Sequence, residues 1–178
     1  MGIGRLVTMM LFGASALAGP AGAQSGSTQG VEPIPRSAFW VTVGMGGGHM
    51  RDAGMLSASL GLSGSRGRRM VSARGLLATD LATTHNEVAV LGGIRGPSRS
   101  FLNAMAGLAY GTRSYDFSAG RENRSGAGLA LELGAHAATK VIGLGAKVFG
   151  TIGSRHTSHA SFAVSIEVGN FGSRGNGR

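Results

Sequence analysis

Eight short segments between residues 39 and 169 alternate apolar residues with small or polar ones. Successive side chains of a β-strand point to opposite faces, so this alternation predicts strands that each have one apolar face. Strands of about 9–11 residues can cross a bilayer when they are tilted. The segments therefore predict four hairpins that close into a small antiparallel barrel. The predicted strands are Phe39–Gly47, Met55–Gly64, Arg69–Thr79, Glu87–Arg95, Ser100–Thr112, Ala127–Ala137, Val141–Thr151 and Ala160–Gly169.

The predicted connections between these strands alternate short with long. Tight turns are expected at residues 65–68, 96–99 and 138–140. Outer-membrane barrels have short turns at one rim and longer loops at the other, so the alternation favours a membrane barrel. The longest predicted loop, Arg113–Ser125, is the expected surface for interaction with a partner. The predicted long loops are His49–Gly54, Asp80–Asn86, Arg113–Ser125 and Ile152–His159.

The apolar face of the predicted strands contains no charged residue. A charge at the middle of a bilayer costs about 2–4 kcal/mol, so this face fits a lipid-facing band. The soluble alternative, a lipocalin-like barrel that binds a ligand, would bury the same face inside. The predicted lipid-facing residues are Leu56, Leu60, Val88, Val90, Leu102, Leu108, Leu129, Leu131, Leu133, Ile142, Leu144, Val148, Phe162, Val164 and Ile166.

The opposite face is mostly Gly, Ala and Ser. A solvated surface usually has about 25–35% charged residues, which this face does not approach. It fits the lumen of an eight-stranded barrel, which side chains fill. Buried charges are costly unless they are paired, so the few inward ionisable groups are expected to form a network, with Glu132 and Lys147 as its first pair. These groups are Arg74, Glu87, Glu132, His136, Lys147 and Glu167. We therefore predict an all-β fold, an eight-stranded antiparallel up-and-down transmembrane β-barrel.

The N-terminal 23 residues have the layout of a secretory signal peptide. A single basic residue, Arg5, precedes an apolar run, and the small residues at 21–23 precede the expected cleavage before Gln24. Residues 24–37 are polar and contain proline, which is typical of a disordered periplasmic lead-in. The barrel is expected over residues 38–171 and a short tail over 172–178. The predicted location is the bacterial outer membrane, reached through the secretory route.

The formal net charge is +9, from 17 basic and 8 acidic residues. The charges are dispersed over predicted turns, and a secreted chain meets no cytoplasmic nucleic acid. Membrane lipid, together with the phosphates of lipopolysaccharide, is the expected counter-charge, and simply solvated turns are the alternative. The chain has no cysteine, which excludes disulfides and thiolate metal sites. A monomer with an unknown surface partner is expected.

Several motifs suggest chemistry only weakly. The glycines of Gly44–Gly48 are like those of a phosphate-binding loop, but no Lys-Ser/Thr pair follows them. Histidines fall in predicted loops without a carboxylate or cysteine companion, so neither a metal site nor a cofactor is predicted. These histidines are His49, His85, His156 and His159.

One segment suggests an enzyme. His156 and Ser158, with Glu167 further along, are similar to the His, Ser and Glu of small lipid A deacylase barrels. In that family an Asn follows the Ser, whereas this chain has His159, and Glu167 is predicted to face inward toward the other end of its strand. A nucleophile and its base must lie within hydrogen-bond reach, so no catalytic residue is predicted.

The glycine-rich closing segments Gly143–Gly150 and Ser161–Gly169 are similar to those of uncharacterised bacterial barrel proteins. With the eight-strand pattern, they make the chain resemble the OmpA/OmpX-like class of small outer-membrane barrels. That resemblance implies a plugged lumen and a structural or surface-interaction role, and it leaves a narrow pore or a lipid A-modifying enzyme as alternatives. Phe171 departs from the class, because it is out of phase with Val164, Ile166 and Val168 and a seven-residue tail follows it.

Overall fold

The computed structural model describes residues 37–50, 53–80, 82–96, 98–117, 120–154 and 157–171. The predicted signal peptide, nearly all of the predicted lead-in and the predicted tail lie outside these residues. The strands are β1 (Ser37–Met50), β2 (Ala53–Arg66), β3 (Arg69–Thr79), β4 (Thr83–Arg95), β5 (Phe101–Phe117), β6 (Gly120–Ala138), β7 (Ile142–Gly153) and β8 (His159–Asn170). Within the described ranges, no helix is long and apolar enough to cross a membrane.

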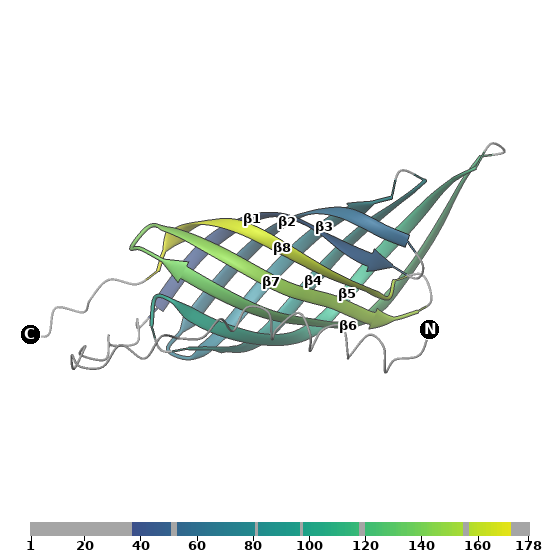
Figure 1. Cartoon of the computed structure of the whole chain (residues 1–178). Helices are drawn as coiled ribbons and strands as arrows, with labels where there is room; N and C mark the ends of the chain where they lie inside the picture. The colour runs from purple at the N-terminus through teal and green to yellow at the C-terminus, as the bar shows by residue number, and fades with distance from the viewer. Residues whose placement is uncertain are drawn as a thin grey trace, which may run out of the picture.

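The eight strands form a closed barrel in sequence order (Figure 1). Every neighbouring pair is antiparallel, and β1 closes the barrel by pairing with β8 from Phe39↔Asn170 to His49↔Ala160. Closure leaves no strand edge unpaired along this register, which is what a bilayer interior demands of a spanning sheet. The predicted eight-stranded antiparallel barrel is confirmed.

The two rims of the barrel differ from the prediction. We call the end that holds Ser37, Asn170 and the β2–β3, β4–β5 and β6–β7 connections the turn rim, and the opposite end the hairpin rim. At both rims only two to five residues separate consecutive strands, so the predicted alternation of short and long connections is wrong. The strands continue through most of the predicted loops, because polar residues can extend a ladder of backbone hydrogen bonds as well as apolar ones.

The largest correction concerns the predicted loop Arg113–Ser125. β5 and β6 have 17 and 19 residues, and they stay paired as far as Phe117↔Gly120. The predicted interaction loop is therefore a two-stranded hairpin, and Figure 1 shows it projecting beyond the rest of the hairpin rim. Its backbone groups are satisfied by pairing rather than by an irregular loop.

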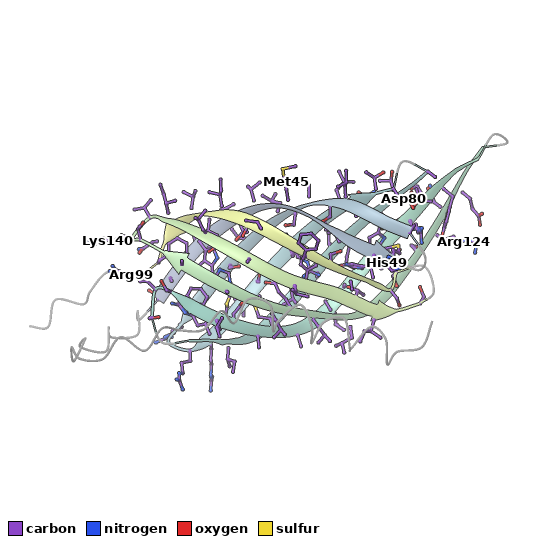
Figure 2. All side chains as sticks on the ribbon, viewed as in Figure 1. Met45, His49, Asp80, Arg99, Arg124 and Lys140 are labelled. Carbon is purple, nitrogen blue, oxygen red and sulfur yellow. The ribbon has the colours of Figure 1, made fainter. Side chains whose placement is uncertain are left out.

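The barrel carries a broad set of large apolar side chains on the outside. Among the residues that the structure describes, twenty-four large hydrophobic side chains are exposed, including Met45 and Leu108, each 74% exposed. Figure 2 shows Met45 pointing outward midway along the barrel, whereas Arg99 and Lys140 lie at one rim and His49, Asp80 and Arg124 at the other. An exposed apolar belt between two polar rims is the surface expected of a protein whose solvent is lipid.

The close approach of β4 and β5 gives a sharp test of the packing. A Cβ added at Gly107 would lie 1.9 Å from the carbonyl oxygen of Val90 and 2.7 Å from the Cα of Leu91, both backbone atoms. Backbone cannot move aside cheaply, so Gly107→Ala is expected to lower the free energy of unfolding by about 1–3 kcal/mol or more. At Gly92 an added Cβ would meet nothing within 4 Å.

Gly92→Ala is therefore the matched control, because it adds the same methyl group on the neighbouring strand. We expect it to change the free energy of unfolding by less than about 0.5 kcal/mol. Urea unfolding of both variants in detergent measures the difference. Equal stability of the two variants would contradict the register of β4 against β5.

Candidate functional site in the lumen

The six ionisable residues predicted to face inward are all buried in the structure. They come from β3, β4, β6, β7 and β8, and alternation along each strand turns them into the lumen. Their contacts place them in two groups rather than one network. The central cluster comprises Arg74, Glu87, Glu132 and Lys147. The turn-rim cluster includes His136 and Glu167.

Arg74 organises the central cluster. Its Nη1 donates to Glu132 Oε2 and its Nη2 donates to Glu87 Oε1, each over 3.0 Å. The planar guanidinium thus holds one carboxylate from β4 and one from β6 across the lumen. Its carbon Cζ also lies 4.3 Å from the ring centroid of Phe149, within cation–π range. Arg74 therefore joins three other strands from inside the barrel.

Lys147 completes the charge balance of the central cluster. Its Nζ lies 3.6 Å from Glu132 Oε1, which is an ion-pair distance but longer than a good hydrogen bond. In the register of β6 and β7, Glu132 lies opposite Phe149 and Lys147 lies opposite Gly134, so the ion pair is diagonal. The predicted Glu132–Lys147 contact is present, but Arg74 is the nearer partner of Glu132. Two cations face two carboxylates, so the cluster is formally neutral.

The diagonal ion pair can be tested by a double-mutant cycle. Glu132→Ala leaves Lys147 without a carboxylate and Arg74 with only Glu87, and Lys147→Ala removes one of the two cations that face Glu132, so each is expected to destabilise the fold. If the two side chains interact, the double variant should cost less than the sum of the single variants, by about 0.5–3 kcal/mol. Unfolding free energies of the four proteins measure the coupling. Additivity within about 0.3 kcal/mol would remove this pair from the cluster.

Two histidines predicted to lie in loops are inside the barrel. His85 belongs to β4 and His159 is the first residue of β8, and both are almost fully buried. Both face the carboxylate of Glu87, with His85 Nε2 at 3.8 Å and His159 Nδ1 at 3.5 Å from Glu87 Oε2. The prediction that loop histidines lack a carboxylate companion is wrong for these two. The reason is that β4 and β8 start earlier than predicted, which extends the inward-facing parity to both residues.

The turn-rim cluster is an aromatic and hydrogen-bonded plug. His136 Nδ1 lies 2.8 Å from Glu167 Oε1, and His136 Nε2 lies 3.1 Å from Asn103 Oδ1. The imidazole is stacked on Phe101, with ring centroids 4.5 Å apart. One ring nitrogen thus faces a carboxylate oxygen and the other faces an amide oxygen. Contacts with Phe101 and Asn103 of β5 and with Glu167 of β8 therefore hold the imidazole of His136 in place.

Aromatic rings close the same end of the lumen. Trp40 is fully buried and stacks on Phe171, with ring centroids 5.4 Å apart. This contact explains why Phe171 is out of phase with the outward-facing residues of β8. Its side chain enters the lumen instead of joining the apolar band. The guanidinium of Arg95 lies 3.9 Å from the ring centroid of Phe101 and donates to the Ser65 hydroxyl over 3.1 Å. Sequence reasoning missed this plug, because its aromatic members lie near the ends of strands.

A third polar group lies at the hairpin rim. Asp80 accepts hydrogen bonds from the amide and the hydroxyl of Thr83, each over 2.7 Å. Arg113 Nη2 lies 3.8 Å from Asp80 Oδ2 and donates to the Thr83 hydroxyl over 3.2 Å. Partial burial raises the pKa of Asp80, but the hydrogen bonds and the positive charge outweigh it and lower the pKa below its usual value. Asp80 is therefore ionised here and ties the β3–β4 connection to β5.

The predicted lipid-facing residues all lie on the outer face. Leu131 and Val148 are half-buried on that face, and the other thirteen are exposed. The exposed members are Leu56, Leu60, Val88, Val90, Leu102, Leu108, Leu129, Leu133, Ile142, Leu144, Phe162, Val164 and Ile166.

The residues that suggested a lipid-modifying enzyme do not meet. The hydroxyl of Ser158 bonds to the backbone of Gly153 and Ser154 at the hairpin rim. Glu167 lies near the other end of β8 and contacts His136. His156 lies outside the described residues. The Ser and Glu therefore form no catalytic group with one another.

No protein-family model matches the chain, and no curated protein matches its sequence. Solved structures do match it. The N-terminal β-barrel domain of Pseudomonas aeruginosa OprF is 13% identical, with a TM-score of 0.57 over 75% of this chain and 98% of that one. Neisserial surface protein A is 12% identical, with a TM-score of 0.57 over 78% and 99%. The Yersinia pestis attachment invasion locus protein Ail is 12% identical, with a TM-score of 0.55 over 77% and 98%.

At these identities the likeness concerns the fold alone. It spans nearly the whole of each neighbouring barrel, so the match is to complete barrels and not to a shared hairpin. Together with the closed order of β1 to β8, it identifies the architecture. The chain has the fold of the small eight-stranded outer-membrane β-barrels, the OmpA/OmpX-like class.

Proposed function

We propose that the chain is a monomeric outer-membrane protein with a closed lumen, which acts through its hairpin rim in a structural or surface-interaction role. The observation that carries the proposal is the inverted distribution of side chains. Large apolar residues are exposed in a band around the barrel, and charged residues are buried inside it. A soluble lipocalin-like barrel would need the reverse, because water would then solvate the outer face.

Side chains at two positions along the barrel axis support closure of the lumen. The central cluster places a guanidinium between two carboxylates across the barrel. In the turn-rim plug Trp40 stacks on Phe171 and meets Phe101 edge to face, and Phe101 stacks on His136. A conducting path would have to break the ion pairs or displace the rings. We therefore favour a filled lumen over a narrow pore. The fold neighbours and the separation of Ser158 from Glu167 give no support to an enzyme.

The projecting β5–β6 hairpin is the proposed interaction element. It carries Arg124, whose Nε lies 2.6 Å from Glu122 Oε1 in an exposed ion pair. The excess of basic residues in the chain suits an anionic partner, such as the phosphate groups of lipopolysaccharide. Among the fold neighbours, Ail has been crystallised with the heparin analogue sucrose octasulfate, a polyanion.

Fractionation and conductance test the proposal together. The protein expressed in a Gram-negative host should sediment with outer membranes, need detergent for solubility and migrate differently on gels before and after heating. The purified barrel in planar bilayers should give no steady conductance. A stable monomer in a detergent-free periplasmic extract would contradict the membrane location. Steady ohmic channels from the unaltered protein would contradict the closed lumen.

A further inference from the structure

Three buried side chains near the hairpin rim converge from opposite walls of the barrel. His85 and Glu87 belong to β4 and His159 belongs to β8. These strands are four places apart in a closed ring of eight, so they face one another across the lumen. One ligand atom from each of the three residues lies within 4.8 Å of the others. The fold thus brings two imidazoles and a carboxylate together at one point.

The polar atoms at this point are left unsatisfied. Among the described residues, Glu87 Oε2, both ring nitrogens of His85 and His159 Nε2 have no hydrogen-bond partner, although all are buried. The distances from Glu87 Oε2 to the imidazoles, 3.5 and 3.8 Å, are too long for good hydrogen bonds. Buried polar groups are normally paired, so a group of four such atoms needs an explanation.

The spacing of these groups approaches that of ligands around a metal ion. Ligands about 2.0–2.2 Å from a tetrahedral zinc ion lie about 3.3–3.6 Å from one another. Glu87 Oε2 lies 3.8 Å from His85 Nε2, slightly beyond that range, and a ligand atom of His159 lies within 4.8 Å of the other two residues' ligand atoms, so modest side-chain movements would bring the three groups to that spacing. Two histidines and a glutamate form a known zinc ligand set that leaves one position for water.

The surroundings hold two of the ligands in place. Arg74 Nη2 binds Glu87 Oε1, which leaves Oε2 turned toward the imidazoles. His159 Nδ1 lies 3.2 Å from the carbonyl oxygen of Thr157. A carbonyl only accepts, so this contact places a proton on Nδ1 and leaves the lone pair on Nε2. Histidines that bind metals are typically oriented by such a contact from their other nitrogen.

The types of ligand at the site, together with the charges near it, decide which ion suits it. Arg74 and Lys147 already balance Glu87 and Glu132, so the site offers no excess of negative charge. Calcium and magnesium require several oxygen ligands, which these residues do not supply. Imidazole nitrogens suit zinc and its neighbours among the transition metals. We propose that His85, Glu87 and His159 bind one zinc-type divalent ion, which links β4 to β8 through the lumen.

The test uses the full-length mature chain without a polyhistidine tag, folded in detergent and freed of metal with EDTA. Zinc is titrated against a chromophoric chelator. We expect one tight site per chain and a higher unfolding midpoint with zinc, but no response to calcium or magnesium. His85→Gln and His159→Gln should each weaken zinc binding by at least about tenfold. The matched control His49→Gln alters a β1 histidine outside the site and should bind like the unaltered protein.

Heat-modifiable migration on gels shows which variants are folded. A further measurement requires no variant at all. X-ray absorption at the zinc edge of the loaded, unaltered protein should show two imidazole ligands with oxygen in the remaining positions. The proposal is overturned if the unaltered barrel binds no zinc, if the folded site variants bind as tightly as His49→Gln, or if the absorption spectrum shows fewer than two imidazoles.

Discussion

Replacement of Arg74 by methionine should destabilise the barrel by about 3–5 kcal/mol. The guanidinium supplies both 3.0 Å hydrogen bonds of the central cluster, one to Glu87 and one to Glu132. Its removal leaves two buried carboxylates facing only Lys147 and neutral groups, and an uncompensated buried charge is costly. Methionine keeps most of the unbranched stem of arginine, so loss of packing is not the main cause. Urea unfolding of the variant in detergent measures the effect.

Two comparisons isolate the electrostatic cause. Arg124→Met removes a guanidinium from an exposed ion pair with Glu122, and such pairs contribute about 0–1 kcal/mol. The double variant Arg74→Met, Glu87→Gln removes the carboxylate that is left without a cation, while Lys147 still faces Glu132, and it should recover much of the lost stability. An Arg74→Met barrel as stable as the Arg124→Met barrel would show that the central cluster does not hold the lumen together.

The second large effect is expected on the outer face. Leu108 is 74% exposed midway along β5, between Val90 of β4 and Leu129 of β6. If this face meets the bilayer interior, Leu108→Arg should impair insertion by about 2–4 kcal/mol. The measurement is the fraction of protein that folds into lipid vesicles, read from gel migration without heating.

The matched control places the same charge at the turn rim. Val141 is exposed in the β6–β7 connection, and a charge near the membrane interface costs only about 0–1 kcal/mol. Val141→Arg should therefore fold almost normally. Equal folding of Leu108→Arg and Val141→Arg would mean that the outer band meets water, as in a soluble barrel.

The fold was predictable because every strand shows the same alternation of apolar residues with small or polar ones. The period of two assigns each side chain to one face regardless of strand length, so the inward position of Arg74 and Glu132 needed only parity. The ends of the strands were not predictable in the same way. Polar residues such as Thr83 and Arg113 carry no apolar signal, and only backbone pairing shows that they continue a strand.

The partners of the lumen groups depend on features that the sequence does not encode locally. Arg74 and Glu132 are 58 residues apart and lie on strands three places apart, so their contact depends on the tilt and stagger of the whole barrel. The approach of His85 to His159 has the same origin. Parity extended by two residues into the predicted loops would have turned both histidines inward, but it would not have placed them at the same depth.

The central claim, that the apolar band faces lipid, is tested most directly by spin labels along β5. The chain has no cysteine, so single cysteines can be introduced at outward positions without background labelling. The outward positions are Leu102, Ala104, Ala106 and Leu108. In lipid vesicles, labels there should collide with dissolved oxygen far more than with a water-soluble nickel chelate, most strongly in mid-strand. Free collision with the nickel chelate at all four positions would contradict the claim.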